Sequence, residues 1–298
     1  RRARAGAVRV SVERLRGGSG PGRSTVSATL RRDRRVAFWL KYNKGFIAMK
    51  STHGLAVAIA LSCAAMTAQA EITGTVGAVS DYDFRGVSLS AKDPALQGSL
   101  DYAHESGFYA GAWASNIDYG DDVDGDLEID LYTGFSGETA GGLAWDAGLV
   151  YYTYPGADDV DAYPEIYAGL GYKWFELKQW FSNDLNASDE DGFYTEINGN
   201  FELPANFGLS LHLGYSYGDA FQAPNDLDDN PDQLEDWEYM DYSVGVTYTL
   251  GRFDLGLKYV DTDLDRDEYG FSSEDVFNSE DRAVFSVSTT FPWCADAE

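Results

Sequence analysis

Apolar and polar side chains alternate with a period of two along most of the chain from residue 71 onward. Within 142–154, for example, Leu143, Trp145 and Leu149 share one face, whereas Asp146 and Gly148 share the other. This period is that of a β-strand, whose successive side chains point to opposite sides of the sheet. The same pattern recurs along the chain and predicts twelve strands, near 72–84, 95–104, 108–118, 127–138, 142–154, 163–174, 175–183, 192–203, 208–218, 239–250, 253–262 and 283–291.

The connections between these predicted strands sort by length. Short connections, such as 105–107 and 251–252, alternate with long ones, such as 219–238 and 263–282. Periplasmic turns and longer extracellular loops give outer-membrane barrels this plan. The pattern therefore predicts an all-β, transmembrane, antiparallel up-and-down β-barrel of about 12 strands over residues 71–298. A soluble β-sandwich is the alternative fold, but its strands are usually only about five or six residues long.

Large aromatic residues gather near the ends of the predicted strands. Tyr151, Tyr152 and Tyr154 do so at one end, and Trp174 and Phe175 at the other. Aromatic girdles at the two lipid interfaces would produce this distribution.

The segment 49–70 has the parts of a cleavable signal peptide. Lys50 is its charged region, 55–61 its short apolar core, and 68–70 (Ala-Gln-Ala) its small-residue cleavage site. We therefore expect export, with cleavage after Ala70. Residues 1–48 form a basic N-terminal extension that we do not expect in the native mature protein.

Residues 71–298 are strongly acidic, with 8 Lys or Arg against 47 Asp or Glu. Such a surface repels phosphates, so nucleic acid is not an expected partner. Cys294 is the single cysteine of this part of the sequence, so an intrachain disulfide cannot form there. No cofactor is expected.

The polar faces of the predicted strands supply the candidate lining of a pore. We expect the inner wall to include Arg85, Glu128, Asp130, Asp146, Glu165, Lys173, Lys178, Glu196, Glu202, His212, Asp254 and Lys258. Charges of both signs in a lumen set ion selectivity or pair with one another. Twelve strands lie between the filled eight-stranded barrel and the open sixteen-stranded one, so the sequence predicts a narrow or partly filled pore.

Arg85 is one of the few basic residues after residue 71, and it follows the first predicted strand at the start of a loop. One interpretation gives it a role in gating or constricting the pore. The other is an ion pair with acids of the loops, because partly buried charges normally pair.

A family resemblance is carried by the segment 80–118. Its matching pieces are Ser80-Asp81-Tyr82, Phe84-Arg85-Gly86-Val87-Ser88, Pro94-Ala95-Leu96-Gln97-Gly98 and Gly107-Phe108-Tyr109. The segment resembles the opening of the TorF family of proteobacterial porins, long regarded as conserved proteins of unknown function. The resemblance implies an outer-membrane barrel with pore activity, and it implies no substrate and no binding residues.

The long loops hold most of the negative charge and suggest cation binding at the acidic extracellular mouth. Asp263, Asp265 and Asp267, followed by Glu274, repeat the spacing of the carboxylates in an EF-hand loop. Glu268 occupies the position at which that loop needs glycine, so a solvated acidic surface is the alternative. The remaining expected partners are outer-membrane lipid, lipopolysaccharide, the barrel-assembly machinery and small solutes.

An outer-membrane lipid hydrolase is the competing class of function. It would need a serine, a histidine and an orienting group within reach of one another. His212 lies on the polar face of its strand with Ser210 and Ser216, and Asn198 is expected on the neighbouring strand. Hydrogen bonding inside the lumen explains this grouping equally well, so we expect no enzyme. The sequence thus favours a channel for passive passage of small solutes with a weak cation preference; a closed structural or adhesive barrel is the alternative.

Overall fold

The computed structural model describes residues 70–118, 125–157, 160–224, 234–236, 238–264 and 279–292. The predicted basic extension and almost all of the predicted signal peptide lie outside these residues and stay predictions. Among the described residues, no helix has both the length and the apolar character needed to cross a membrane.

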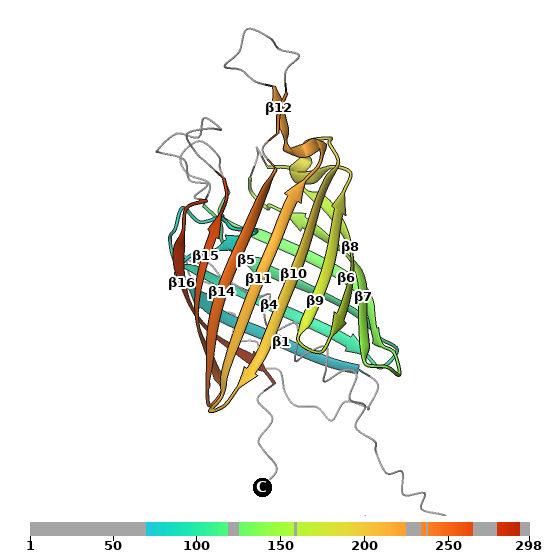
Figure 1. Ribbon diagram of the computed structural model, residues 1–298, viewed down its shortest axis with the longest axis vertical. Helices are drawn as coiled ribbons and strands as arrows, with labels where there is room; N and C mark the ends of the chain where they lie inside the picture. Colours follow the sequence, from blue (N-terminus) through green and yellow to red (C-terminus); the bar gives the residue numbers. More distant parts are fainter. Residues whose placement is uncertain are drawn as a thin grey trace, which may run out of the picture. The chain divides into compact units, whose positions relative to one another are not determined.

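Twelve antiparallel strands close into a barrel (Figure 1), which confirms the predicted fold class. Each wall strand pairs with its neighbours along the chain, and β1 closes the ring by pairing with β16 from Gly74↔Phe291 to Val79↔Ser286. The wall strands are β1 (Ala70–Val79), β4 (Ala95–His104), β5 (Phe108–Ser115), β6 (Glu128–Glu138), β7 (Leu143–Thr153), β8 (Tyr163–Tyr172), β9 (Phe175–Ser182), β10 (Gly192–Leu203), β11 (Phe207–Tyr217), β14 (Tyr239–Leu250), β15 (Phe253–Thr262) and β16 (Arg282–Phe291).

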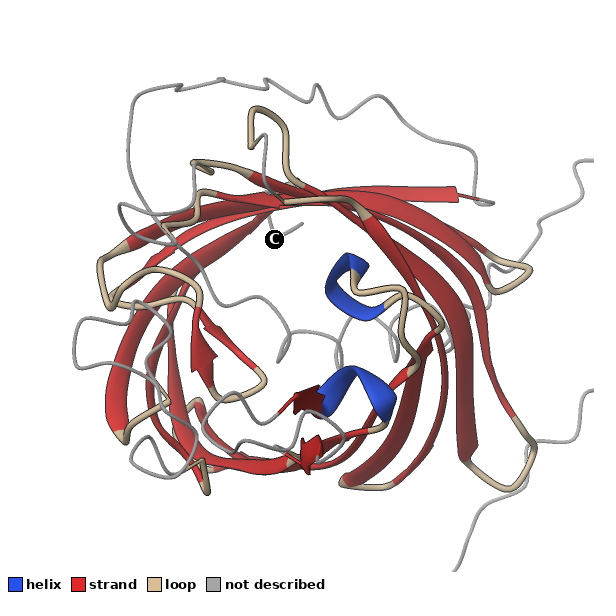
Figure 2. Ribbon diagram, turned by 90° about the horizontal axis from the view of Figure 1, so that it is seen from above, coloured by secondary structure: helices blue, strands red, loops and turns tan. Residues whose placement is uncertain are grey.

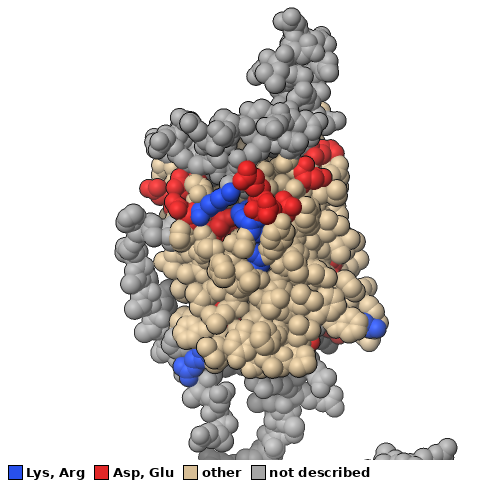
Figure 3. Space-filling model, turned by 60° about the vertical axis from the view of Figure 1, so that its left-hand side comes forward, with Lys and Arg blue, Asp and Glu red and all other residues tan. Residues whose placement is uncertain are grey.

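The apolar face of each wall strand points outward and the polar face points inward. On β8, Ile166 is 53% exposed whereas its neighbour Glu165 is 1% exposed. Figure 3 shows the result on one side of the barrel, where a broad belt without charged residues separates charged margins above and below. Because a soluble protein rarely exposes so large an apolar area, this belt is suited to the hydrocarbon of a bilayer.

Aromatic side chains edge this belt at both ends, as predicted. Tyr151 and Tyr259 are exposed near the long loops, and Trp174 and Phe207 near the short turns. Tyr152 and Tyr154 do not belong to the girdle, contrary to the expectation, because the period of two turns both into the lumen. Tyr152 is 4% exposed there, and the Tyr154 hydroxyl donates to Glu128 at 3.3 Å.

The first strand is shorter than the sequence pattern predicts. β1 ends at Val79, and residues 80–94, which we call the finger, fold away from the wall. The finger carries a small hairpin made of β2 (Asp83–Phe84) and β3 (Val87–Ser88). Viewed along the barrel, this hairpin lies inside the ring of wall strands (Figure 2).

Two other long loops also send short elements inward. They are the 3₁₀ turns η2 (Leu185–Ala187) and η3 (Asp219–Phe221), which lie inside the ring in Figure 2. A further hairpin, β12 (Gln222–Pro224) with β13 (Leu234–Asp236), follows η3 and extends beyond the barrel rim in Figure 1.

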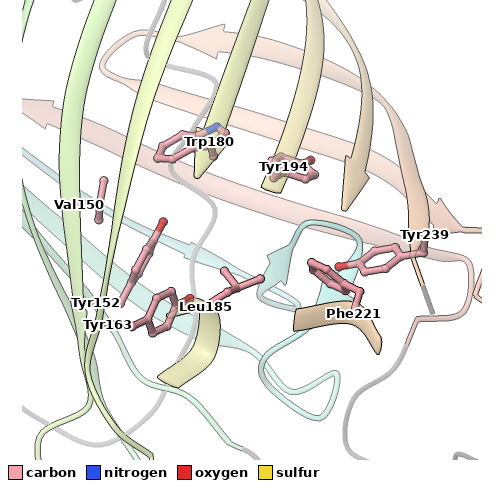
Figure 4. Close-up of a cluster of buried hydrophobic side chains, with 8 residues drawn as sticks. All are labelled: Val150, Tyr152, Tyr163, Trp180, Leu185, Tyr194, Phe221 and Tyr239. Atoms are coloured by element: carbon pink, nitrogen blue, oxygen red, sulfur yellow. The ribbon is translucent and has the colours of Figure 1, made fainter. Parts of the chain in front are cut away.

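An apolar cluster forms where η2 and η3 meet the inner wall. Leu185 from η2 and Phe221 from η3 pack with wall side chains, and Phe84 and Val87 of the finger pack against the same cluster. Figure 4 shows the cluster members converging from several strands and from both 3₁₀ turns: Val150, Tyr152, Tyr163, Trp180, Leu185, Tyr194, Phe221 and Tyr239. The long-loop half of the lumen is therefore filled by protein.

The outward face yields a test of the membrane assignment. Ile197 lies outward near the middle of β10, and Leu203 lies outward at its end. Ile197→Arg should lower the free energy of unfolding by about 2–4 kcal/mol, and Leu203→Arg by only about 0–1 kcal/mol, because the cost of a charge falls with distance from the bilayer centre. Denaturant unfolding in lipid vesicles measures both, and equal costs at the two positions would contradict the assignment.

Candidate functional site

The base of the finger is a compact hydrogen-bonded turn centred on Asp81. Its Oδ1 accepts the hydroxyls of Ser88 at 2.6 Å and Ser90 at 2.7 Å. The backbone amide of Tyr82 donates to Ser90 Oγ at 3.1 Å. Asp81, Ser88 and Ser90 are all buried, so these bonds satisfy polar groups that water cannot reach. The finger is thus a folded element rather than an extended loop.

The first clamp joins the finger to β15 and β16. Arg282 of β16 donates to Asp81, to Asp83 Oδ1 at 2.8 Å and to the carbonyl of Gly86 at 2.9 Å. Lys258 of β15 donates to the other oxygen of Asp83. Burial alone would raise the pKa of Asp83, but Lys258 and Arg282 outweigh it and hold that pKa below its ordinary value.

Gly86 lets the tip of the finger approach the wall. Its φ of +81° lies in the left-handed region, and a Cβ there would come within 2.4 Å of Thr262 Cγ2 and 2.6 Å of Asp241 Cβ. No other residue fits this position without displacing the finger from β14 and β15.

The second clamp joins the finger to β8. Arg85 donates from Nη1 to Glu165 Oε1 at 3.0 Å and from Nη2 to Oε2 at 2.8 Å, the bidentate geometry of a strong ion pair. Its side chain is 9% exposed and that of Glu165 is 1% exposed. Burial would lower the pKa of Arg85, but the Glu165 carboxylate raises it above its ordinary value, so the guanidinium stays charged.

The two clamps grip opposite sides of the ring. β8 is six positions from β16 in the closed order of twelve strands. The finger therefore crosses the lumen from one side to the other, held by an ion-pair network at each end.

Aromatic rings surround the Arg85 guanidinium. Its carbon lies 4.3 Å from the ring centroid of Tyr194, 4.8 Å from that of Phe84 and 5.7 Å from that of Trp180. At these distances the ring faces attract a cation, and more strongly where water is excluded. Arg85 thus lies in a pocket of the wall that combines a carboxylate with aromatic faces.

A separate network surrounds His212 of β11. Its Nδ1 lies 2.7 Å from Asn198 Oδ1, and its Nε2 lies 2.7 Å from Asp241 Oδ1 and 2.9 Å from the hydroxyl of Tyr194. Both ring nitrogens are therefore engaged by groups other than a serine. The predicted pairing of β10 with β11 is present, with Asn198 opposite His212, but the grouping is a hydrogen-bonded network and does not have the geometry of a Ser-His pair.

The short-turn half of the lumen holds charges of both signs around a cavity. Lys178 Nζ lies 3.6 Å from Glu176 Oε1 and 3.9 Å from Asp146 Oδ2, and Tyr109 donates to Asp146 Oδ1 at 2.6 Å. A cavity of about 230 Å³ lies at this end, lined in part by Tyr109, Asp146 and Glu176. Glu176 thus forms its ion pair with Lys178, two residues along the same strand.

Most of the predicted pore-lining residues lie on the inner face. Glu128, Asp130, Glu165, Lys178 and Glu196 are buried there. Glu196 accepts the indole N–H of Trp180 at 2.7 Å. Asp130 Oδ1 is buried and has no hydrogen-bond partner among the described residues.

Three predicted lining residues lie at the short-turn margin instead of deep in the lumen. Lys173 occupies the turn after β8, where its ammonium lies 5.2 Å from the ring centroid of Tyr172. Glu202 is exposed near the end of β10. Asp254 accepts the hydroxyl of Thr249 at 2.6 Å in an exposed position.

The predicted metal site falls largely outside the described residues. Asp265, Asp267 and Glu274 lie there, and Asp263 accepts the backbone amide of Met240 at 2.6 Å. Among the residues that are described, no group of three or more His, Cys, Asp or Glu is arranged to hold a metal ion. The loop site stays a prediction.

Sequence reasoning missed Asp83, Asp241 and Arg282. Asp83 was included in the predicted first strand. Arg282 was left out of the predicted last strand, which began at residue 283. The alternation of β16 would have placed Arg282 on the inner face with Val284. Asp241, which is 1% exposed, follows Tyr239 on the inner face of β14.

Comparisons with solved structures find other barrels at low sequence identity. An outer-membrane channel from Pseudomonas putida F1 shares 12% identity at a TM-score of 0.43, over 76% of this chain and 96% of that one. The KdgM porin, solved with disordered oligogalacturonate, shares 8% identity at a TM-score of 0.42, over 74% of this chain and 99% of that one. The NanC porin gives the same identity and TM-score, over 74% of this chain and 100% of its own. Similarity at this level carries no conclusion about the function of the present protein.

The sequence comparisons give a family but no function. No curated protein matches the sequence at a significant level. A family model described as a bacterial protein of unknown function (Gcw_chp) matches residues 63–291. Since this match spans most of the chain, the protein belongs to that bacterial family.

Proposed function

We propose that the protein is an outer-membrane channel for passive passage of small solutes, with a weak preference for cations. The observation that carries the proposal is the reversal of the usual distribution of residues: the apolar side chains lie outside a closed barrel and the charged ones inside. Such a wall satisfies every backbone group within a bilayer and offers a polar route through it. Export by the predicted signal peptide and membership of the TorF family remain part of this proposal.

The cation preference rests on the balance of charge inside the barrel. The buried charged residues include six acids, Asp81, Glu128, Asp130, Glu165, Glu196 and Asp241, and two bases, Lys178 and Arg282. Arg85 and Lys258 offset part of the excess, but acids still outnumber bases. A negative lumen concentrates cations and repels anions.

The finger supports a channel that is closed or constricted in this conformation. It spans the lumen and is fixed to both sides by ion pairs, whereas the short-turn half retains a cavity. Passage of solutes then requires the finger to shift. The same finger is the observation that favours the second candidate, a closed structural or adhesive barrel, in which it never moves.

Loss of the second clamp should open the channel. Arg85→Ala leaves the buried Glu165 carboxylate without its partner, a change that costs about 3–5 kcal/mol and loosens the docked finger. We expect a severalfold higher single-channel conductance in planar bilayers, with potassium favoured over chloride. The matched control is Lys92→Ala, because Lys92 pairs with Glu280 on the exposed rim and its loss should leave conductance unchanged.

If the parent protein conducts no ions, and neither do the variants Arg85→Ala and Asp83→Asn, the channel is contradicted and the closed barrel is favoured. Anion selectivity in the conducting state would contradict the cation preference.

Acid should release the first clamp. Because the pKa of Asp83 is lower in the folded protein than its ordinary value of 3.8, its ionised form stabilises docking above about pH 4, and this contribution is lost as pH falls through the lowered pKa. We expect the conductance of the parent protein, measured at a series of pH values, to increase as the pH is lowered below 4.

Asp83→Asn isolates this effect from the titration of other carboxylates. The variant has no charge at residue 83 for Lys258 and Arg282 to hold, so it should conduct more than the parent at neutral pH and show a smaller acid response. An acid response of the same size in both proteins would show that Asp83 is not the group responsible.

A further inference from the structure

The wall pocket that holds Arg85 has the construction of a receptor for guanidinium groups. We propose that Arg85 acts as an internal ligand of this pocket, and that solutes bearing a guanidinium group bind there when the finger withdraws. The inference rests on the proposed channel in one respect, namely that the finger can leave the wall. It adds a class of solute, organic cations with a planar, hydrogen-bonding head.

The carboxylate of the pocket is fixed by the wall and not by the finger. Glu165 Oε2 accepts the hydroxyl of Tyr152 at 2.8 Å. Tyr152 in turn stacks on Tyr163, with ring centroids 4.8 Å apart and an interplanar angle of 26°. Both tyrosines belong to wall strands and are almost fully buried. Glu165 therefore keeps its orientation when Arg85 leaves, with both oxygens available to a forked donor.

The aromatic faces of the pocket are held in the same manner. Trp180 donates its indole N–H to Glu196 Oε1 at 2.7 Å. The Tyr194 hydroxyl donates to Asp241 Oδ2 at 3.0 Å. These bonds fix the rings from behind, so their faces remain directed at the position of the Arg85 guanidinium. A binding site built from such rigid groups loses little conformational entropy when a ligand enters.

The wall carries more acceptor capacity next to this pocket than Arg85 uses. Asp130 of β6 lies opposite Tyr152 in the register of β6 with β7. Its side chain is 9% exposed, and its Oδ1 has no hydrogen-bond partner among the described residues. This carboxyl oxygen beside Tyr152 offers a further acceptor to a ligand that carries more than two N–H donors.

The geometry selects guanidinium over ammonium. Two parallel N–H donors match the two oxygens of Glu165 at 3.0 and 2.8 Å, and a flat cation can also stack between the faces of Tyr194 and Trp180. A compact ammonium can satisfy the charge but cannot form both the forked hydrogen bonds and the stacked contacts. Methylguanidinium, methylammonium and methylurea therefore form a graded series of probes.

Isothermal titration of the detergent-solubilised protein tests the proposal without any need for conduction. Arg85→Ala, which empties the pocket, should bind methylguanidinium at least about tenfold more tightly than Arg85→Ala/Glu165→Gln, because charge-assisted hydrogen bonds are lost in the double variant. Methylammonium should bind Arg85→Ala more weakly than methylguanidinium, and methylurea should not bind measurably. The parent, whose pocket is occupied, should bind methylguanidinium more weakly than Arg85→Ala.

A second variant, Asp83→Asn, and a second measurement, conductance in bilayers, extend the test. Asp83→Asn keeps Arg85 but weakens the opposite clamp, so methylguanidinium should bind it more tightly than the parent. In bilayers, methylguanidinium should reduce the raised conductance of Arg85→Ala, whereas methylurea should not.

The inference is overturned if Arg85→Ala shows no saturable binding of methylguanidinium or binds it no better than the double variant. Binding without conductance would retain the receptor and reject the channel. Conductance without binding would retain the channel and reject the receptor.

Discussion

The rest of the structure depends on one constraint: a strand that crosses hydrocarbon must find partners for all its backbone amides in neighbouring strands. Closure of β1 onto β16 meets this constraint by leaving the twelve-stranded wall without a free long edge. The period of two then separates the side chains, so that Ile166 and Leu170 face outward while Glu165 and Tyr167 face inward on β8. Charges gathered inside such a wall have little water and must pair with one another, and the finger supplies many of the missing partners.

The finger gives a physical reason for the short sequence Ser80-Asp81-Tyr82-Asp83-Phe84-Arg85-Gly86-Val87-Ser88. Asp81 and Ser88 build its base. Asp81, Asp83 and Arg85 form ion pairs with the wall, and Gly86 allows the close approach to Asp241 and Thr262. Tyr82 packs on Trp113 and Phe84 on Tyr152. Nearly every side chain of this segment therefore has a function in docking, which is why so specific a motif occurs in what would otherwise be a surface loop. The finger occupies the long-loop end of the lumen, and a cavity lies at the short-turn end.

The sequence predicted the wall well because alternation is a local property: eleven of the predicted strands coincide with wall strands to within a few residues, and the inward placement of Glu128, Glu165 and Lys178 followed from the same period. The first strand was extended too far because Tyr82 and Phe84 continue the alternation, although they pack inside the lumen.

No local pattern reveals that Arg85 meets Glu165, since 80 residues separate them. The clamp from Arg282 to Asp83 spans 199 residues, so only closure of the ring brings these groups together. Tyr152 was misplaced in the girdle because its residue type suits both a lipid interface and a filled lumen.

The central claim, that the apolar face meets lipid and the polar face does not, can be measured with two native tryptophans. Trp145 is 42% exposed on the outer face, and Trp180 is 4% exposed on the inner face. Two variants, each retaining one of these tryptophans with the others replaced by phenylalanine, are reconstituted in vesicles of phospholipids brominated along their acyl chains. The account predicts strong quenching of Trp145 fluorescence and little quenching of Trp180. Equal quenching of both residues, or a protein that remains dissolved and monomeric without lipid or detergent, would contradict it.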